Sequence, residues 1–404
     1  MDKPVSLAQA PAGASLSWRA RWVLSRLEAG LREGALRVDM PDGTHRCLGS
    51  GEPVARWVLR QESALWRTLL HGDIGFAEGW MMGGWDTDDL AGLLMFLARN
   101  ERPGGDVIDG WSALRWLDRM RHWTRRNTRD QSRRNIASHY DLGNEFYSAW
   151  LDRSMTYSAA MFEHPDEPLE QAQARKYAHL AKLIGLAPGQ EVLEIGCGWG
   201  GFAEHALSVG ARVHGISLSQ AQTAYAASRL AAIDPERSSH LLEIRDYRDV
   251  DRQYDAIASI EMLEAVGEQY WPTYAAAIRK ALKPGGKAGI QTITIAPSRF
   301  EGYRRRPDFI QRYIFPGGML PTEPLLDRIF REAGLRITGT VRFADGYATT
   351  LARWRERFDA AWPLLSGGGF DARFRRMWQY YLGYCEAGFR LGTIDVIQIR
   401  VEHA

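Results

Sequence analysis

A short apolar run that passes directly into closely spaced glycines constrains this chain more than any other feature. Residues 192–201 read VLEIGCGWGG. A buried strand followed by Gly196, Gly198 and Gly200 predicts a tight turn, because residues without side chains let backbone amides approach a ligand and let the next helix pack closely. A glycine pattern alone is weak, so its context has to be tested.

The context is a series of alternating helix and strand signals. Strand-like runs lie at 191–196, 211–217, 240–246, 254–260 and 287–295, and helical patterns at 171–186, 201–207, 219–230 and 273–282. Strands separated by helices of this length predict a mostly parallel, doubly wound α/β sheet of the Rossmann-like kind with helical insertions. An acidic residue before the glycines, without a phosphate-gripping lysine, favours S-adenosylmethionine over ATP as the cofactor.

The length of 404 residues exceeds one average domain. We predict a small N-terminal α+β domain at residues 1–105, a linker at 106–134 and the cofactor domain at 135–404. The linker combines Trp116 and Trp123 with many arginines. It reads either as a basic amphipathic helix that docks on anionic lipid headgroups or as a solvated helix face packed on the next domain.

Composition narrows the class of function. A formal net charge of +2 gives no indication of a nucleic-acid binder, and three scattered cysteines form neither a zinc motif nor a disulfide framework. The chain has no signal-peptide-like start and no run of about eighteen apolar residues. We therefore expect a cytoplasmic protein whose membrane contact is peripheral, on the inner face, with no bound metal.

Two cofactor contacts can be placed from the strand ends. The second strand ends in GISLSQAQ and lacks the acid that often binds ribose hydroxyls, so Ser217 and Gln222 are expected to replace it. Asp246 follows the next strand, where it either accepts from the exocyclic amine of adenine or is a solvated loop acid.

Longer segments carry a family resemblance. They are IASHYDLGNEFYSAWLDRSMTYSAAMF at 136–162, YIFPGGMLP at 313–321, ADGYATTLARWRERFDAAWP at 344–363 and YYLGYCEAGFR at 380–390. Together they resemble the cyclopropane fatty acid synthase family from about Asn135 onward. The segment at 72–86, GDIGFAEGWMMGGWD, is similar to the small lipid-carrier-like domain of many such enzymes.

The resemblance implies methyl transfer from S-adenosylmethionine to a double-bond carbon of an unsaturated phospholipid acyl chain, through a carbocation. The partners it implies are that acyl chain and an anionic membrane surface; we also expect a homodimer and consider a downstream lipid oxidoreductase. Active-site positions match Tyr140, Tyr347 and Cys385. The cofactor-lining residues that we expect are Tyr157, Ser158, Gly196, Gly198, Gly200, Ser217, Leu218, Gln222, Asp246, Tyr247 and Ile260.

Three positions depart from the family pattern around its bicarbonate ion. Ala159, Gln291 and Ala265 stand where the family has a cysteine and two histidines, so a bicarbonate site is doubtful. Glu261 replaces a family glycine three residues before Glu264, and on a helical turn the two carboxylates would share a face. We hypothesise that Glu261, with Glu264 as its partner, replaces bicarbonate as the general base or stabilises the cation.

A tethered base favours a methyl- or methylene-branched product, or a furan-lipid precursor, over a cyclopropane. Three alternatives remain open at this stage. They are a true cyclopropane synthase, a soluble methyltransferase acting on oxygen or nitrogen of a small metabolite, and a non-catalytic lipid-binding protein with the same fold.

Overall fold

The computed structural model describes residues 17–101 and 142–404, and the chain divides into two compact units. Among the described residues, the first unit consists of 17–101 and 369–387, and the second of 142–368 and 388–404. The linker predicted at 106–134 and Tyr140 lie outside the described residues. The predicted boundaries at 105 and 134 therefore stay predictions.

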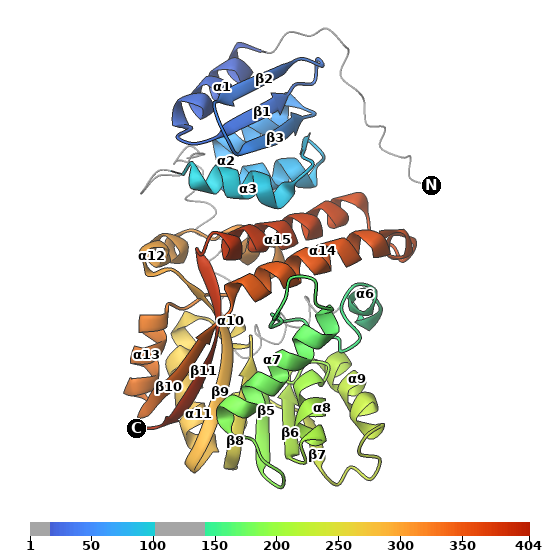
Figure 1. The fold of residues 1–404 in the computed structure, drawn as a ribbon, viewed down its shortest axis with the longest axis vertical. Coiled ribbons are helices and arrows are strands. Elements are labelled where there is room, and N and C mark those ends of the chain that lie inside the picture. The colour runs from blue at the N-terminus through green and yellow to red at the C-terminus, as the bar shows by residue number, and fades with distance from the viewer. Residues whose placement is uncertain (1–16, 102–141) are drawn as a thin grey trace. The chain divides into compact units, whose positions relative to one another are not determined.

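The first unit is an α+β layer built on a four-stranded sheet of order β2-β1-β3-β4 (Figure 1). Its elements are α1 (Trp18–Gly30), β1 (Ala35–Asp39), β2 (His45–Gly49), β3 (Val54–Leu59), α2 (Glu62–Met81), β4 (Trp85–Asp86), α3 (Leu90–Arg99) and most of α15 (Ala372–Arg390). Within this unit the Arg376 guanidinium lies 3.9 Å from the Trp80 ring centroid, and the Trp80 indole donates to the Arg376 carbonyl at 2.7 Å. The segment 369–387 is thus held by the aromatic core of α2.

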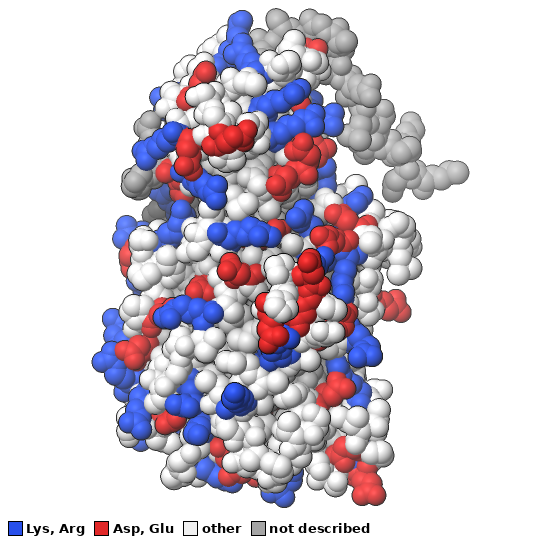
Figure 2. All heavy atoms as spheres, viewed as in Figure 1, with Lys and Arg blue, Asp and Glu red and all other residues white. Residues whose placement is uncertain are grey.

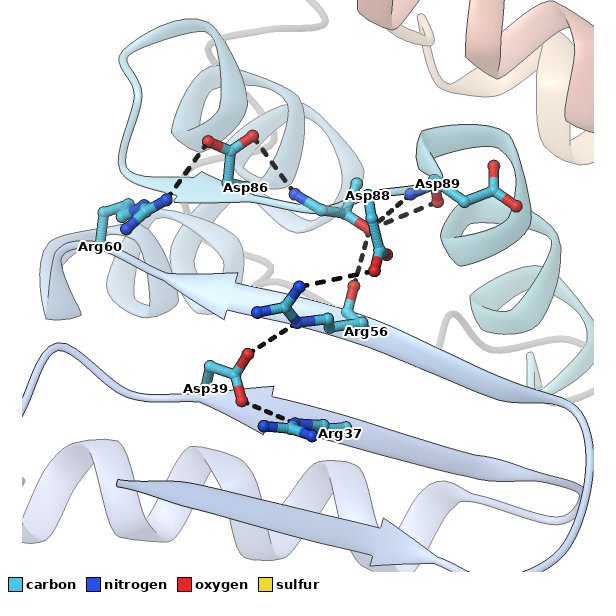
Figure 3. Close-up of polar contacts among 8 residues, drawn as sticks. Arg37, Asp39, Arg56, Arg60, Asp86, Asp88 and Asp89 are labelled. Carbon is cyan, nitrogen blue, oxygen red and sulfur yellow. Dashed lines mark hydrogen bonds and ion pairs between the residues drawn. The ribbon is translucent and has the colours of Figure 1, made fainter. Parts of the chain in front are cut away.

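Charges are interspersed rather than segregated on the face drawn in Figure 2. The sheet of the first unit gives an example, in which arginine and aspartate side chains pair with each other (Figure 3). Parallel pairing sets Arg37 beside Arg56, and Asp39 accepts from both guanidiniums, at 2.9 and 2.7 Å. The Arg37 hydrogen bond is the main reason that the pKa of Asp39 lies below its usual value. On this face of the sheet the charged side chains are therefore paired with opposite charges, and the surface is polar rather than apolar.

The second unit is a seven-stranded sheet of order β10-β11-β9-β8-β5-β6-β7 (Figure 1). Its strands are β5 (Glu191–Ile195), β6 (Arg212–Ser217), β7 (His240–Ile244), β8 (Tyr254–Ile260), β9 (Leu282–Ile295), β10 (Leu335–Arg342) and β11 (Ile394–His403). Strands β5 to β9 pair in parallel, and β11 pairs antiparallel with both β9 and β10. The predicted doubly wound α/β fold is confirmed.

Helices cover both faces of this sheet. The side chains of β5 point alternately to the two faces and pack against the helices there. Val192 packs with Tyr177 and Leu180 on one face, while Leu193 packs with Trp271 on the other. The helical elements of the unit are α6 (Asn144–Ser148), α7 (Leu169–Ile184), α8 (Gly201–Ser208), α9 (Gln220–Ala231), η1 (Tyr247–Asp249), α10 (Leu263–Val266), η2 (Glu268–Tyr270), α11 (Trp271–Ala281), α12 (Pro297–Arg305), η3 (Ile310–Ile314), α13 (Glu323–Glu332) and α14 (Ala344–Gly367). Chain order reverses between β5 and β8, which is where a doubly wound sheet opens a crevice for ligands.

Candidate active site

A pocket lies at this crevice, at the carboxyl ends of β5, β6 and β8. It encloses about 1200 Å³ of empty space, its open mouth included. All but one of the expected cofactor residues line it: Tyr157, Ser158, Gly196, Gly198, Ser217, Leu218, Gln222, Asp246, Tyr247 and Ile260. The exception is Gly200, which serves as the N-cap of α8.

The glycine turn adopts a backbone that side chains disfavour. Gly196, Gly198 and Gly200 have φ angles of +83°, +51° and +85°. A Cβ on Gly196 would lie 3.0 Å from Cγ of Met262, whereas nothing lies within 4 Å of the equivalent position on Gly198. The turn therefore needs glycine for its conformation, and at Gly198 it leaves open space for a ligand.

The end of β6 supplies hydroxyl and amide groups instead of an acid. Ser217 accepts at Oγ from the amide of Ser219 at 3.1 Å, and Ser219 in turn caps α9 by accepting from the amide of Gln222 at 3.3 Å. All three side chains are buried. This arrangement directs the start of α9, and with it Gln222, toward the pocket.

Asp246 is buried and forms a bidentate pair with Arg248, at 2.8 Å from Nε and 2.6 Å from the terminal nitrogen. The Arg248 guanidinium also lies 5.6 and 5.7 Å from the ring centroids of Tyr247 and Tyr270. A carboxylate has about four acceptor sites, so this pairing is compatible with an added bond from an adenine amine. That role for Asp246 stays a prediction, and Arg248 is a pocket residue that the sequence analysis missed.

Glu261 follows β8 and sits in a nest of donors. Its Oε1 accepts from the Ala159 amide at 2.8 Å and from the Gln291 amide nitrogen at 2.7 Å, and its Oε2 accepts from the Tyr347 hydroxyl at 2.7 Å. Burial raises the pKa of Glu261, and the Tyr347 bond is the largest influence opposing that rise. Two of the three positions that depart from the family pattern thus meet at this carboxylate.

A second layer fixes the orientation of Gln291. Its side-chain oxygen accepts from Gln398 at 2.9 Å, and the Gln398 oxygen lies 2.6 Å from Nδ1 of His179. Because the oxygen of Gln291 is engaged by Gln398, its nitrogen is the group that faces Glu261.

The expected helical pairing of Glu261 with Glu264 is wrong in geometry. Glu261 has a φ angle of +50° and precedes α10, whereas Glu264 lies within α10. The left-handed residue turns the chain sharply, so the two carboxylates reach different partners. Glu264 accepts from the Thr292 hydroxyl at 3.0 Å and from the Ile293 amide, and it does not line the pocket.

The two carboxylates are nevertheless coupled. Burial, and secondly the charge of Glu261, raise the pKa of Glu264 to about 8. Its Oε2 has no hydrogen-bond partner within 17–101 and 142–404. Near neutral pH Glu264 is therefore protonated, and Glu261 remains as the ionisable group of the pair that faces the pocket.

Aromatic side chains close the wall beside Ser158. The Tyr157 ring centroid lies 5.2 Å from that of Trp354, 5.4 Å from Tyr147 and 5.7 Å from Trp150. Among these rings Tyr157 lines the pocket, and the other three pack against it. Cys385 lies on α15, in the segment assigned to the first unit.

One buried cation was also missed. Lys176 on α7 has no exposed surface, and its Nζ donates to Oγ of Ser158 at 2.7 Å. A signal existed in the sequence, because Lys176 falls at four-residue spacing between Ala172 and Leu180 on the apolar stripe of its helix.

Comparisons with known proteins agree with this geometry. The family model described as mycolic acid cyclopropane synthetase matches residues 127–399. The chain is 41% identical to the tuberculostearic acid methyltransferase of Mycobacterium tuberculosis, over 90% of this chain and 86% of that protein. It is 34% identical to the cyclopropane-fatty-acyl-phospholipid synthase of Escherichia coli, over 82% of this chain and 84% of that one.

A solved structure gives the same result. The mycolic acid cyclopropane synthase CmaA1, in complex with S-adenosylhomocysteine, superposes with a TM-score of 0.59 at 28% identity. It covers 67% of this chain and 97% of its own. The glycine turn, the open space at Gly198 and the hydroxyl and amide groups at the end of β6 fit S-adenosylmethionine as the cofactor. The chain belongs to the cyclopropane synthase family of S-adenosylmethionine-dependent methyltransferases.

Proposed function

We propose that this enzyme methylates a double-bond carbon of an unsaturated acyl chain in a membrane phospholipid, and that its product is a methyl- or methylene-branched chain. Two relatives support the substrate class, since one is named a tuberculostearic acid methyltransferase and the other a cyclopropane-fatty-acyl-phospholipid synthase. The more similar of these two is named a methyltransferase rather than a cyclopropane synthase.

One observation carries the proposal for the product. The Glu261 carboxylate accepts from Tyr347 and from Ala159 and Gln291, which are two of the positions at which the family pattern has bicarbonate-site side chains. A bicarbonate ion there would compete for the same donors and would lie against a second anion. The residues of this chain do not fit that ion, and Glu261 takes its place.

The chemistry follows from what Glu261 can reach. S-adenosylmethionine supplies an electrophilic methyl group. The acyl double bond donates its electron pair to that carbon, while the S–CH3 bond breaks and leaves its electrons on the sulfur of S-adenosylhomocysteine. A positive charge remains on the adjacent acyl carbon. Glu261 then accepts a proton from the acyl chain, and the electrons of that C–H bond form a new double bond. A carboxylate held by three hydrogen bonds has a restricted reach. A proton taken from a neighbouring acyl carbon leaves a methyl branch beside a new double bond in the chain. A proton taken from the added methyl group, once a hydride has moved from the methylated carbon to the cationic one, leaves a methylene branch.

Product NMR tests the proposal. The full chain is incubated with methyl-labelled S-adenosylmethionine and vesicles of defined mono- or diunsaturated phospholipid. We expect methyl-branch or vinylidene signals and no cyclopropane methylene protons. A cyclopropane as sole product would establish the alternative of a true cyclopropane synthase, and turnover of only a water-soluble acceptor would indicate a small-molecule methyltransferase.

A variant pair tests the base. Glu261→Gln keeps the size of the side chain but cannot accept the proton, so we expect turnover to fall by about 10²–10³-fold with little change in cofactor affinity. The control is Glu268→Gln, whose carboxylate pairs with Arg304 outside the pocket. Full activity of Glu261→Gln would disprove the assignment.

Membrane association has support from one described surface. No helix within the described parts of the chain is long and apolar enough to cross a bilayer. On α1, Trp18 and Trp22 are 68% and 47% exposed, Arg21 and Arg26 share their face, and the Arg26 guanidinium lies 5.5 Å from the Trp22 ring. Tryptophan and arginine together suit an anionic headgroup layer. A peripheral, inner-face location, a homodimer and a downstream oxidoreductase stay predictions.

A further inference from the structure

Lys176 is a fully buried lysine that contacts the wall of the cofactor pocket. Its Nζ lies 2.7 Å from Oγ of Ser158 and 4.0 Å from the ring centroid of Tyr177. Ser158 and Tyr177 both line the pocket, although Lys176 itself does not. One side chain therefore separates an ammonium group from the space that the cofactor fills.

Acidic groups from three segments act on this lysine. They are Glu261 after β8, Asp152 in the segment between α6 and α7, and Glu194 on β5. Arg229 of α9 is the other cation that acts on Glu194 and Tyr177. Burial lowers the pKa of Lys176 to about 7, and the three acids oppose that fall. A nearby change of one unit of charge is thus enough to alter its protonation at physiological pH.

The cofactor undergoes such a change of charge in each catalytic cycle. S-adenosylmethionine carries a positive sulfonium, whereas S-adenosylhomocysteine, which is left after methyl transfer, is neutral at sulfur. Like charges a short distance apart disfavour each other, and a buried site screens them weakly.

We propose that Lys176 is a positioning residue that senses the charge of the cofactor: binding of the sulfonium form expels a proton from Lys176 to solvent, and binding of the neutral form does not. The inference concerns the cofactor site alone, so it holds whichever acceptor is methylated and whether or not Glu261 is the base. It follows that S-adenosylmethionine competes less well with S-adenosylhomocysteine in acid, where the ammonium repels the sulfonium.

The expected effect is large enough to measure. Two unit charges within about 10 Å at an effective dielectric near 20 change a binding constant on the order of tenfold. We expect the ratio of Kd for S-adenosylmethionine to Kd for S-adenosylhomocysteine to fall on the order of tenfold between pH 6 and pH 8.5.

Isothermal titration calorimetry of the full chain with both ligands provides the test. Titrations in buffers of different ionisation enthalpy count the protons released. In the wild type, the sulfonium ligand should release a proton that the neutral ligand does not. In Lys176→Met the two counts should be equal and the affinity ratio flat with pH, whereas Lys176→Arg, with a permanent charge, should hold the ratio at its acid value.

Two results would overturn the proposal. One is equal proton release by the two ligands in the wild type, which needs no variant at all. The other is retention of the pH-dependent ratio in Lys176→Met, which would assign the proton to Glu194 or Glu261. If Lys176→Met does not fold, Lys176→Arg decides: an affinity ratio that is flat with pH supports Lys176, and a ratio that still changes between pH 6 and pH 8.5 contradicts it.

Discussion

At the scale of single residues, the burial of Glu264 makes the stability of the fold depend on pH. Its pKa is raised to about 8 in the folded protein against an ordinary value of 4.5. At pH values between these two, Glu264 keeps its proton in the folded state but has lost it in the unfolded state. The stability that this proton contributes is present at low pH and is lost as pH rises through about 8. The side chain in Glu264→Gln stays neutral. We therefore expect its free energy of unfolding to rise relative to that of the wild type by at most about 1.4 kcal/mol for each pH unit in this window.

Thermal unfolding at pH 5, 7 and 9 checks this expectation. The difference in melting temperature between Glu264→Gln and the wild type should be small at pH 5 and should grow toward pH 9. Glu268→Gln, in an exposed pair, is the control and should show no such trend. A difference that is constant with pH would mean that Glu264 is ionised throughout.

Residue types could be predicted from the sequence, but their conformations could not. The departures at Ala159 and Gln291 pointed to a changed site, and both contact Glu261. The left-handed φ of Glu261 was invisible, because that conformation depends on the surrounding fold and is rare for residues other than glycine. For the same reason the expected helical pairing with Glu264 was wrong.

At the scale of elements, the alternation of strands and helices could be predicted because the hydrophobic pattern within each element repeats with the period of a strand or of a helix. The helix expected at 273–282 and the strand expected at 287–295 left residues 283–286 between them, yet the structure includes these residues in β9, which runs from Leu282 to Ile295. The register of β8 against β9 shifts between Tyr254 and Ala256, as at a bulge. A bulge depends on the partner strand, which a single run of sequence does not contain.

Helix α1 makes a prediction of its own for membrane docking. Each basic residue near an anionic surface contributes about 1 kcal/mol, so Arg21→Gln with Arg26→Gln should weaken binding to phosphatidylglycerol vesicles about thirtyfold. Co-sedimentation measures the affinity, and phosphatidylcholine vesicles should show little difference. The matched control is Arg305→Gln with Arg331→Gln, which removes two exposed arginines from α12 and α13. Equal losses in both pairs would contradict a specific role for α1.

At the scale of the whole molecule, the chain crosses between its two units more than once. Residues 369–387 belong to the first unit, and the following residues return to form β11 in the sheet of the second. Sequence order alone suggested one N-terminal domain followed by one catalytic domain. The contact of Arg376 with Trp80 could not be predicted in this way, because the sequence around either residue gives no indication of the other.

This division predicts how the cofactor stabilises the molecule. Every residue that lines the pocket belongs to the second unit, so S-adenosylhomocysteine should stabilise that unit by about 2.7 kcal/mol at one hundred times its Kd. In differential scanning calorimetry we expect two transitions, of which one rises with ligand concentration and the other stays in place. The first unit can be marked by Arg376→Ala, which removes the cation over Trp80 and should lower only the ligand-insensitive transition. If both transitions moved together with ligand, the two units would unfold as one cooperative body, and the crossings of the chain would couple them more strongly than their separate cores suggest.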